Sequence, residues 1–342
     1  MAKLGLGWTR WWAIIFLAAI SGLIIVGFLF FSFDKNSGPP IDVVYTWVDG
    51  SDPLWRRKKE QYSGEPRSDD NVRYHSIDEL KYSLRSISQY APWVNHIYIV
   101  VDDVQVPAFL NVNHPKITVV KHSDIIDPDA LPLFNSVAIE TGLHHIPGLS
   151  ECFLYFNDDM FLGAPISKSD VVDICYSEPN HPSFPTVTVS PKDEEWICNI
   201  KQGFHLVKQK YPDAELVVPA HISHFCRKSL CYEIENEFPD VFQHTTQQKF
   251  RKKNDDDLCQ SICLPKIQYQ LGVCKGVYRN IPSTPEIYRY FEMTDAIELE
   301  SVRALRDEKP MFFCINNNNT TTRELRDCLE SLFPNPSPFE LK

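Results

Sequence analysis

The stretch Cys152-Phe-Leu-Tyr-Phe156 runs directly into Asn157-Asp158-Asp159, and this junction decides the fold. The apolar and aromatic run predicts a buried strand, and the polar residues after it predict a turn. Open α/β sheets bind ligands at the carboxyl ends of their strands. Adjacent carboxylates repel each other, and Mg²⁺ or Mn²⁺ prefers carboxylate oxygens together with substrate phosphate. We therefore expect Asp158 and Asp159 to bind Mg²⁺ or Mn²⁺ beside a diphosphate, with an ordinary solvated turn as the alternative.

The segments around this junction alternate between strand-like and helix-like patterns. β-branched and aromatic runs predict strands, and apolar residues at helical spacing predict helices between them. This alternation over roughly 120 residues predicts an α/β fold with a mainly parallel, doubly wound sheet. A less regular C-terminal half follows. The expected strands are 41–47, 96–101, 117–121 and 152–156, and the expected helices are 77–87, 135–146, 227–237 and 324–332.

The N-terminus carries an uncharged apolar run, Ala13 to Phe31. Its length suits a helix that crosses a bilayer, and Lys3 and Arg10 before it place the N-terminus in the cytoplasm. A cleaved signal peptide is the alternative, although its apolar region is usually shorter. The predicted organisation is a cytoplasmic tail (1–12), a transmembrane signal-anchor (13–33), a linker (34–40) and a lumenal catalytic domain (41–342).

The ten cysteines all lie between Cys152 and Cys328. An even number in a lumenal chain favours disulfides, and the CxxC spacing typical of zinc sites is absent. Cys226–Cys231 and Cys259–Cys263 are close enough in sequence for local disulfides. Two overlapping glycosylation sequons in Asn318–Thr321 fit the same compartment.

The charge balance limits the partners of the chain. There are 34 basic and 45 acidic residues, which give a formal net charge of −11. This argues against nucleic acid, which requires a basic surface. It permits a diphosphate ligand, because a bound metal ion supplies local positive charge.

Four blocks of sequence resemble the Stealth family of sugar-1-phosphate transferases, in the order found in that family. The family includes bacterial capsule polymerases and the lysosomal-enzyme N-acetylglucosamine-1-phosphotransferase. The resemblance implies a core like an A-type nucleotide-sugar glycosyltransferase fold. Asn317 departs from the pattern, because the family usually has an acid there. The matching segments are Ile41–Pro53; Arg73–Ser76, Leu80–Ser86, Ala91–Val100, Ala138–Glu140 and Phe156–Met160; Ala220–His224, Phe238–Phe242, Phe250–Arg251 and Asp255; and Phe313–Asn316.

The resemblance also implies a reaction and roles for particular residues. The expected donor is UDP-GlcNAc, the acceptor is a hydroxyl of a glycan or glycoprotein, and the products are a phosphodiester and UMP. Together with the signal-anchor predicted at 13–33, it implies a single-pass type II protein of the Golgi or ER membrane. The implied catalytic residues are His221, as general base, and Arg251, on phosphate. The implied donor-binding residues are Asp42, Tyr45, Trp47, Asp49, Arg85, Glu140 and Asn157. The implied metal ligands are Asp158, Asp159 and Asp255.

Simpler interpretations of these residues remain open. Tyr45 and Trp47 could be core aromatics, Glu140 a surface glutamate, His221 a buried histidine and Arg251 part of a solvated basic run. Two other functions also remain: a metal-dependent glycosyltransferase that releases UDP, and a non-catalytic lumenal glycan-binding protein.

Overall fold

The computed structural model describes most of the unit Pro39–Lys342. The other unit, Met1–Gly38, lies outside the described residues except for Gly38. The described residues are 38–63, 74, 76–169, 171, 185–186, 194–250, 261–275, 278, 281–282, 284–293, 296–317 and 322–341.

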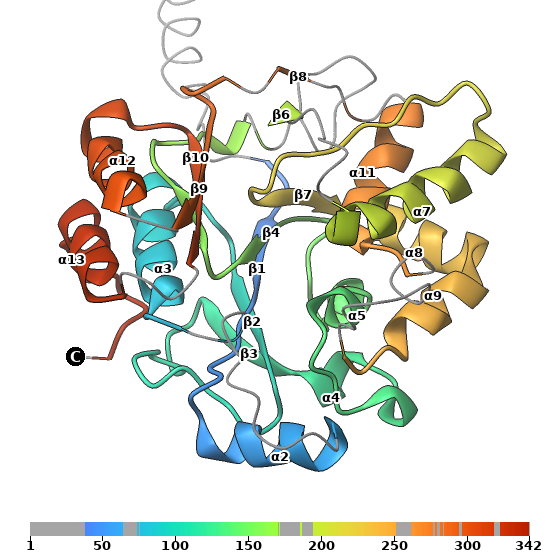
Figure 1. The fold of residues 1–342 in the computed structure, drawn as a ribbon, viewed down its shortest axis with the longest axis horizontal. Coiled ribbons are helices and arrows are strands. Elements are labelled where there is room, and N and C mark those ends of the chain that lie inside the picture. The colour runs from blue at the N-terminus through green and yellow to red at the C-terminus, as the bar shows by residue number, and fades with distance from the viewer. Residues whose placement is uncertain are drawn as a thin grey trace, which may run out of the picture. The chain divides into compact units, whose positions relative to one another are not determined.

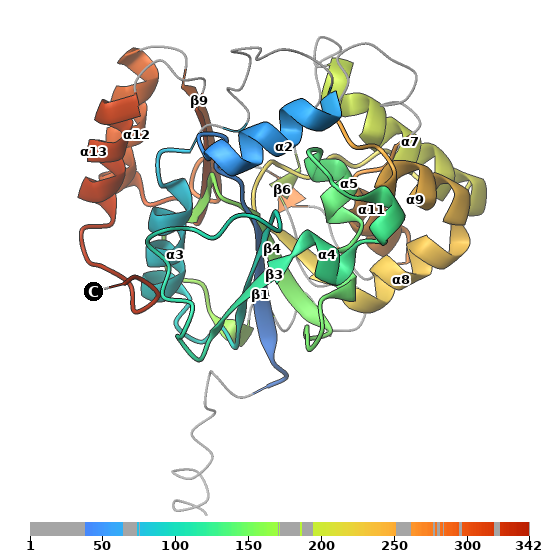
Figure 2. The same cartoon turned by 90° about the horizontal axis from the view of Figure 1, so that it is seen from below.

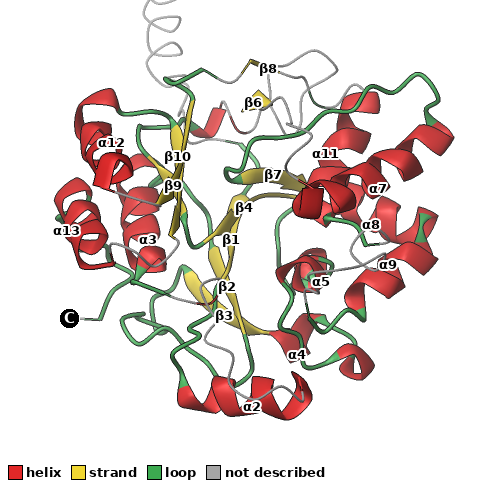
Figure 3. Cartoon of the chain, viewed as in Figure 1, coloured by secondary structure: helices red, strands yellow, loops and turns green. Residues whose placement is uncertain are grey.

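A five-stranded sheet in the order β3-β2-β1-β4-β7 forms the centre of this unit (Figure 3). The first four strands are parallel, and β7 is antiparallel to β4. The predicted mainly parallel α/β sheet is therefore confirmed, and each expected strand is found within one residue of its predicted ends. The strands are β1 (Ile41–Thr46), β2 (Ile97–Val101), β3 (Ile117–Lys121), β4 (Cys152–Asn157) and β7 (His224–Arg227).

The strand order changes direction at β1. The chain adds β2 and then β3 on one side of β1, and returns to add β4 on the other side. Thr46 and Asn157, the last residues of β1 and β4, lie opposite each other in the ladder. Ligands of open α/β sheets bind at such a switch point, beside the carboxyl ends of the strands.

Each face of this sheet packs into its own apolar core. Along β1, Ile41, Val43 and Tyr45 belong to one cluster of buried side chains and Val44 to the other. This alternation follows from the two-residue period of a strand. Because both faces are covered, the strands are almost entirely apolar.

Helices lie on both sides of the central sheet (Figures 1 and 2). α3, α12 and α13 lie on one side, and α5, α7, α8, α9 and α11 on the other. The helices are α2 (Pro53–Ser63), α3 (Glu79–Tyr90), α4 (His122–Ile125), α5 (Ser136–Glu140), α7 (Glu194–Lys210), α8 (Lys228–Glu237), α9 (Pro239–Thr246), α11 (Leu264–Cys274), α12 (Ala296–Glu308) and α13 (Thr322–Leu332). The short 3₁₀ helices are η2 (Pro128–Ala130) and η3 (Leu143–His145).

A second sheet, in the order β5-β10-β9, begins where the first one ends. β4 passes through the turn at Asp158 and Asp159 into β5, which pairs antiparallel with β10. The two carboxylates therefore lie at the junction of two sheets. The strands are β5 (Met160–Leu162), β9 (Tyr288–Met293) and β10 (Phe312–Asn317), and a separate pair is β6 (Pro185–Thr186) with β8 (Ile281–Pro282).

The helices differ from the prediction in several regions, and the unpredicted helices are α2, α4, α7, α9, α11 and α12. The expected helix 135–146 is α5 followed by η3, separated at Gly142. A Cβ at Gly142 would lie 2.9 Å from the backbone carbonyl oxygen of Ile125, which favours glycine at this position even though glycine weakens a helix. The helix α2 was not predicted, although Asp52 before Pro53 is a typical start signal: its Oδ1 accepts the Leu54 N–H at 2.7 Å.

The disulfide prediction is wrong for both local pairs. The described cysteines Cys226, Cys231, Cys263, Cys274, Cys314 and Cys328 are free thiols. Cys226 on β7 and Cys231 on α8 are both free thiols despite their short spacing. Cys263 instead donates to Glu140 at 3.4 Å. Cys152 is disulfide-bonded, but it belongs to the central sheet and to neither expected pair.

The membrane-anchored architecture also requires correction. Among the described residues, none of the helices has the length and apolar character needed to cross a bilayer. The predicted tail, signal-anchor and most of the linker (1–12, 13–33 and 34–37) lie outside the described residues, as do the sequons at Asn318–Thr321.

Arg85, which was predicted to bind the donor, makes structural contacts with the C-terminal segment. It is buried on α3, and its guanidinium binds both carboxylate oxygens of Glu340 at 2.9 Å. It also donates to Glu330 at 3.1 Å and to the Phe333 carbonyl at 2.7 Å. The bidentate geometry is typical of a strong arginine–carboxylate pair. Arg85 thus attaches the C-terminal segment to α3.

Arg85→Ala should lower the free energy of unfolding by roughly 3 kcal/mol, because Arg85 is buried and its loss leaves Glu340, whose side chain is 10% exposed, without its partner. Glu330→Gln is the matched control: Glu330 is 49% exposed, so its loss should cost less than about 1 kcal/mol. Urea unfolding of the two variants measures both values. Equal, small losses would show that this cluster does not hold the C-terminal segment.

Candidate active site

The turn after β4 places one carboxylate in an unusual position. The Asp159 backbone carbonyl accepts the Ile315 N–H at 3.0 Å, which fixes the turn against β10. Its Oδ2 accepts a hydrogen bond from the Cys314 thiol at 3.4 Å. Its Oδ1 is buried and has no hydrogen-bond partner among the described residues. Such an atom carries a large desolvation cost unless a further group binds it.

Three acidic side chains influence one another here. Burial raises the pKa of Asp159 from 3.8 to about 6 and that of Glu79 from 4.5 to about 7. Burial, followed by the charges of Glu79 and Asp159, holds the pKa of Asp158 well above its ordinary range. Glu79 begins α3, where its Oε2 accepts the Ile77 N–H at 2.7 Å. Strongly perturbed carboxylates at a strand end are typical of functional sites.

The antiparallel pairing of β7 with β4 brings His221 to this turn. Tyr155 of β4 pairs with His224, so the chain just before β7 lies at the carboxyl end of β4. The side chains of Asp159, His221 and Cys314 each offer a ligand atom within 4.8 Å of the others. His221 is half-buried, so its imidazole combines a nearby carboxylate with access to solvent.

Strand β9 and strand β10 contribute residues that the sequence did not predict for the site. The Tyr290 ring lies edge-on to His221, with ring centroids 6.1 Å apart, and its hydroxyl accepts from Asn316 Nδ2 at 3.0 Å. Burial raises the Tyr290 pKa to about 12, so its hydroxyl is neutral at physiological pH. Cys314 lay inside a matched block, which was the one available signal.

A buried hydroxyl joins two of the predicted donor-binding residues. The Tyr155 hydroxyl lies 3.1 Å from Glu140 Oε1 and 2.8 Å from Asn157 Oδ1. The Thr46 hydroxyl lies 2.9 Å from it, across the β1–β4 ladder. Glu140 is therefore a buried polar residue beside the switch point, and the surface interpretation does not apply.

Other predicted donor-binding residues lie elsewhere or have other contacts. Asp42 is at the amino end of β1, where it accepts from Asn95 and from the Ser150 N–H, each at 2.7 Å. Tyr45 is a core residue, and its hydroxyl lies 2.7 Å from Ser83 Oγ. The structure thus places Asp42 at the end of β1 opposite the acidic turn. Tyr45 lies one residue before the carboxyl end of β1, where it pairs with Phe156, and burial together with the nearby charge of Asp158 raises its pKa.

Trp47 and Asp49 follow β1 at the correct edge of the sheet. Trp47 is partly buried, and its N–H donates to the Val100 carbonyl at 3.0 Å. The Asp49 carbonyl accepts from Gln105 Nε2 at 2.7 Å, and its Oδ1 accepts the Ser51 N–H at 2.8 Å. The predicted residues Arg251 and Asp255 lie outside the described residues.

The described residues at this turn fit a divalent cation. Asp159 offers a buried oxygen without a partner, and Asp158 adds a second carboxylate whose charge is disfavoured by its neighbours. Carboxylate oxygens suit Mg²⁺ and Mn²⁺. Burial and the charge of Asp159 hold the Cys314 pKa well above its ordinary value, so the thiol stays protonated and remains a hydrogen-bond donor.

Comparison with known proteins gives four matches to one family. The models of Stealth protein conserved regions 1 to 4 match residues 39–66, 73–178, 220–258 and 303–342, respectively. These ranges contain the four blocks identified in the sequence. They also contain Asp159, His221 and Cys314.

Several curated relatives share most of this chain. An exopolysaccharide phosphotransferase of Streptomyces coelicolor is 39% identical over 89% of this chain and 53% of its own length. One from Lactiplantibacillus plantarum is 31% identical over 92% of this chain and 99% of its own. A capsular polysaccharide phosphotransferase of Haemophilus influenzae is 34% identical over 84% and 80%. The chain spans about half the length of this S. coelicolor relative and of a second exopolysaccharide phosphotransferase from the same organism.

These relatives correct the predicted location. They are bacterial exopolysaccharide and capsular enzymes rather than Golgi proteins, so the assignment to a Golgi or ER membrane is wrong. Their names agree with the prediction of a phosphotransferase enzyme.

Solved structures resemble this chain only distantly. The bifunctional glycosyltransferase WbbM is 13% identical with a TM-score of 0.41, covering 90% of this chain and 51% of its own. The galactosyltransferase LgtC is 11% identical with a TM-score of 0.41, covering 86% and 97%.

The carboxylates predict how stability depends on pH. An acid whose pKa is raised by folding stabilises the folded state below its unfolded value, and this contribution is lost as the pH rises through its folded value. For Asp159 and Glu79 the loss falls between about pH 4 and about pH 7. Over this window, the melting temperature of metal-free wild type relative to Asp159→Asn should fall as the pH rises. Saturating Mg²⁺ or Mn²⁺ should restore the melting temperature of the wild type and leave that of Asp159→Asn unchanged.

The comparison with Asp159→Asn is needed because buried histidines also change the melting temperature. A histidine whose pKa is lowered by folding makes the folded state more stable as the pH rises, which is opposite to the effect of Asp159. His122 and His144, for example, both have a pKa lowered to about 4 by burial. A melting-temperature difference between wild type and Asp159→Asn that does not change with pH would contradict the raised pKa of Asp159.

Proposed function

This chain belongs to the Stealth family, and from that membership we propose that it transfers a sugar 1-phosphate from a nucleotide diphosphate sugar to a hydroxyl of a glycan acceptor. UDP-GlcNAc is the proposed donor, and the products are a phosphodiester and UMP. The relatives named exopolysaccharide and capsular phosphotransferases support this class of reaction.

One observation carries the proposal: an acidic turn and a half-buried histidine converge at the switch point of the sheet. Asp159 and His221 offer ligand atoms within 4.8 Å of each other, although they are far apart in sequence. Phosphoryl transfer needs charge stabilisation at the phosphate and a group that receives the proton of the nucleophile. The acidic turn is suited to holding a cation that stabilises the phosphate charge, and His221 is suited to receiving the proton.

In the proposed reaction, His221 accepts the proton of the acceptor hydroxyl. The acceptor oxygen forms a bond to the β-phosphorus, and the bond from that phosphorus to the bridging oxygen breaks, which releases UMP. An imidazole suits this step because its ordinary pKa of about 6.5 lies near the working pH. Tyr290, which packs edge-on to His221, would keep the imidazole in position.

The proposed cation is Mg²⁺ or Mn²⁺, held by Asp159 and Asp158, with Asp255 as a third proposed ligand. When bound, it neutralises negative charge on the donor diphosphate. Arg251 is proposed to hold a phosphoryl oxygen through paired hydrogen bonds. Trp47, Asp49, Glu140 and Asn157, at or near the carboxyl ends of β1 and β4, are the proposed donor pocket.

A donor radiolabelled at the β-phosphorus tests the reaction type. The label should appear in the sugar product, joined through a phosphodiester, while unlabelled UMP forms in equal amount. A metal-dependent glycosyltransferase would attack the anomeric carbon with the same carboxylates nearby. In that case the label would leave with UDP and the glycosidic product would contain no phosphate. Label that stays in intact donor with every acceptor tried would favour a glycan-binding protein.

His221→Ala should lower turnover by roughly 10²–10⁴-fold with little change in donor affinity, the range typical of a lost general base. His205→Ala is the matched control, because His205 is an exposed histidine on α7, and it should retain wild-type turnover. Steady-state kinetics with folding checked by circular dichroism compares the two. Near-normal turnover of His221→Ala would remove this residue from the mechanism.

A further inference from the structure

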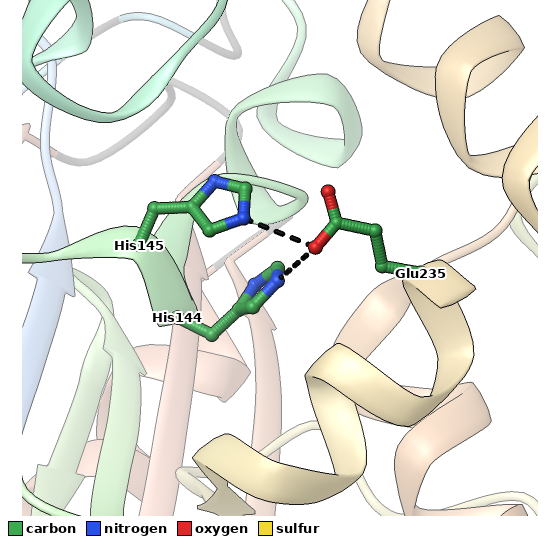
Figure 4. Close-up of side chains that lie close together, drawn as sticks. All are labelled: His144, His145 and Glu235. Atoms are coloured by element: carbon green, nitrogen blue, oxygen red, sulfur yellow. Dashed lines mark hydrogen bonds and ion pairs between the residues drawn. The ribbon is translucent and has the colours of Figure 1, made fainter.

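A second cluster of ligating side chains lies away from the acidic turn, between η3 and α8 (Figure 4). His144 and His145 are neighbours on η3, and Glu235 reaches them from α8. Both imidazoles direct Nε2 at the same oxygen, Glu235 Oε2, at 2.9 Å from His144 and 3.1 Å from His145. The three ligand atoms all lie within 4.8 Å of one another.

The hydrogen bond at His145 Nδ1 determines which group can lie between His145 Nε2 and Glu235 Oε2. His145 Nδ1 lies 3.3 Å from the Ile125 carbonyl, which can only accept, so Nδ1 carries the hydrogen. In a neutral imidazole Nε2 is then unprotonated. Its lone pair would face a carboxylate oxygen at 3.1 Å, which is repulsive unless a positive charge lies between them.

Burial lowers the pKa of His144 to about 4, which favours its neutral imidazole. His144 is fully buried and packs against the rings of Tyr232 and Phe242. Its ring centroid lies 4.1 Å from that of His145, so two adjacent imidazolium ions would repel each other. A metal ion satisfies all three groups, because neutral imidazole and carboxylate are its natural ligands.

We propose that His144, His145 and Glu235 form a binding site for a divalent transition metal, with Zn²⁺ as the best fit. Two imidazole nitrogens and one carboxylate oxygen are a known zinc ligand set. The Ile125 carbonyl orients His145 in the way that outer partners commonly orient metal-bound histidines. The side chains of His145 and Glu235 are 33% and 31% exposed, so a fourth ligand can be water.

The bound metal would connect two segments that are distant in sequence. η3 follows directly on α5, which carries Glu140, and α8 follows directly on β7. The metal would therefore tie the segment that carries Glu140 to the helix that leaves the central sheet. Its proposed role is structural, and it depends on none of the residues assigned to phosphoryl transfer.

Binding of Co²⁺ and Zn²⁺ to metal-free protein tests this site. The experiment uses the full chain carrying Asp159→Asn, which removes one proposed ligand of the cation site at the acidic turn. Visible absorption should show one Co²⁺ per chain with nitrogen and oxygen ligands. Zn²⁺ should displace the Co²⁺ and raise the melting temperature. Affinity should fall as the pH falls, because protons compete for the imidazoles.

Substitutions within α8 and η3 assign the metal to its ligands. His145→Gln and Glu235→Gln should each weaken Co²⁺ binding by more than about 10-fold and abolish the Zn²⁺-dependent rise in melting temperature. Glu233→Gln is the matched control: Glu233 is on the same helix and pairs with Lys275 at 2.6 Å, so binding should be unchanged.

Three results would overturn the proposal. One is a Co²⁺ spectrum that is unaffected by His145→Gln and Glu235→Gln. Another is a spectrum dominated by thiolate charge-transfer bands, which would place the metal on cysteine. The third is no response to Zn²⁺ together with stabilisation at low pH, which would mean that His145 is an imidazolium paired with Glu235.

Discussion

The buried carboxylate of Asp159 is the constraint on which the candidate active site depends. The turn that carries it is held between two sheets, with its carbonyl bonded to Ile315 and its Oδ2 to Cys314. Asp159 has an Oδ1 atom that is buried and has no hydrogen-bond partner among the described residues. Its pKa is raised to about 6 as a result, and its neighbours Asp158 and Glu79 are raised as well. A fold that keeps such a group either stores a cost in stability or binds a cation there.

The topology explains how the remaining groups reach this carboxylate. The switch in strand order places the ends of β1 and β4 side by side, with Thr46 and Asn157 paired. The antiparallel strand β7 then returns His221 to the same edge, and β10 adds Cys314 from the second sheet. Each contribution follows from one pairing of strands. The site is thus a property of the sheet junction rather than of a single loop.

Much of this could be predicted from local sequence, because short apolar runs with polar ends mark buried strands clearly. The acidic turn after β4 was found in the same way. His221 was found only through the family resemblance, since its position depends on an antiparallel pairing that no local pattern reveals. The ion pairs of Arg85 could not be predicted, because its partners Glu330 and Glu340 lie 245 and 255 residues along the chain. The expected Cys226–Cys231 disulfide failed because proximity in sequence does not determine how a thiol on strand β7 and a thiol on helix α8 are oriented.

The central claim is that Asp159 holds a divalent cation for a diphosphate donor, and Mn²⁺ binding followed by electron paramagnetic resonance tests it most directly. Linkage requires that donor and cation strengthen each other's binding if they share a site. Wild-type protein should bind Mn²⁺ more tightly in the presence of UDP-GlcNAc, and Asp159→Asn should lose both the binding and this dependence. Glu235→Gln should retain both. Mn²⁺ affinity that is the same in wild type and Asp159→Asn, or indifferent to the donor, would contradict the account.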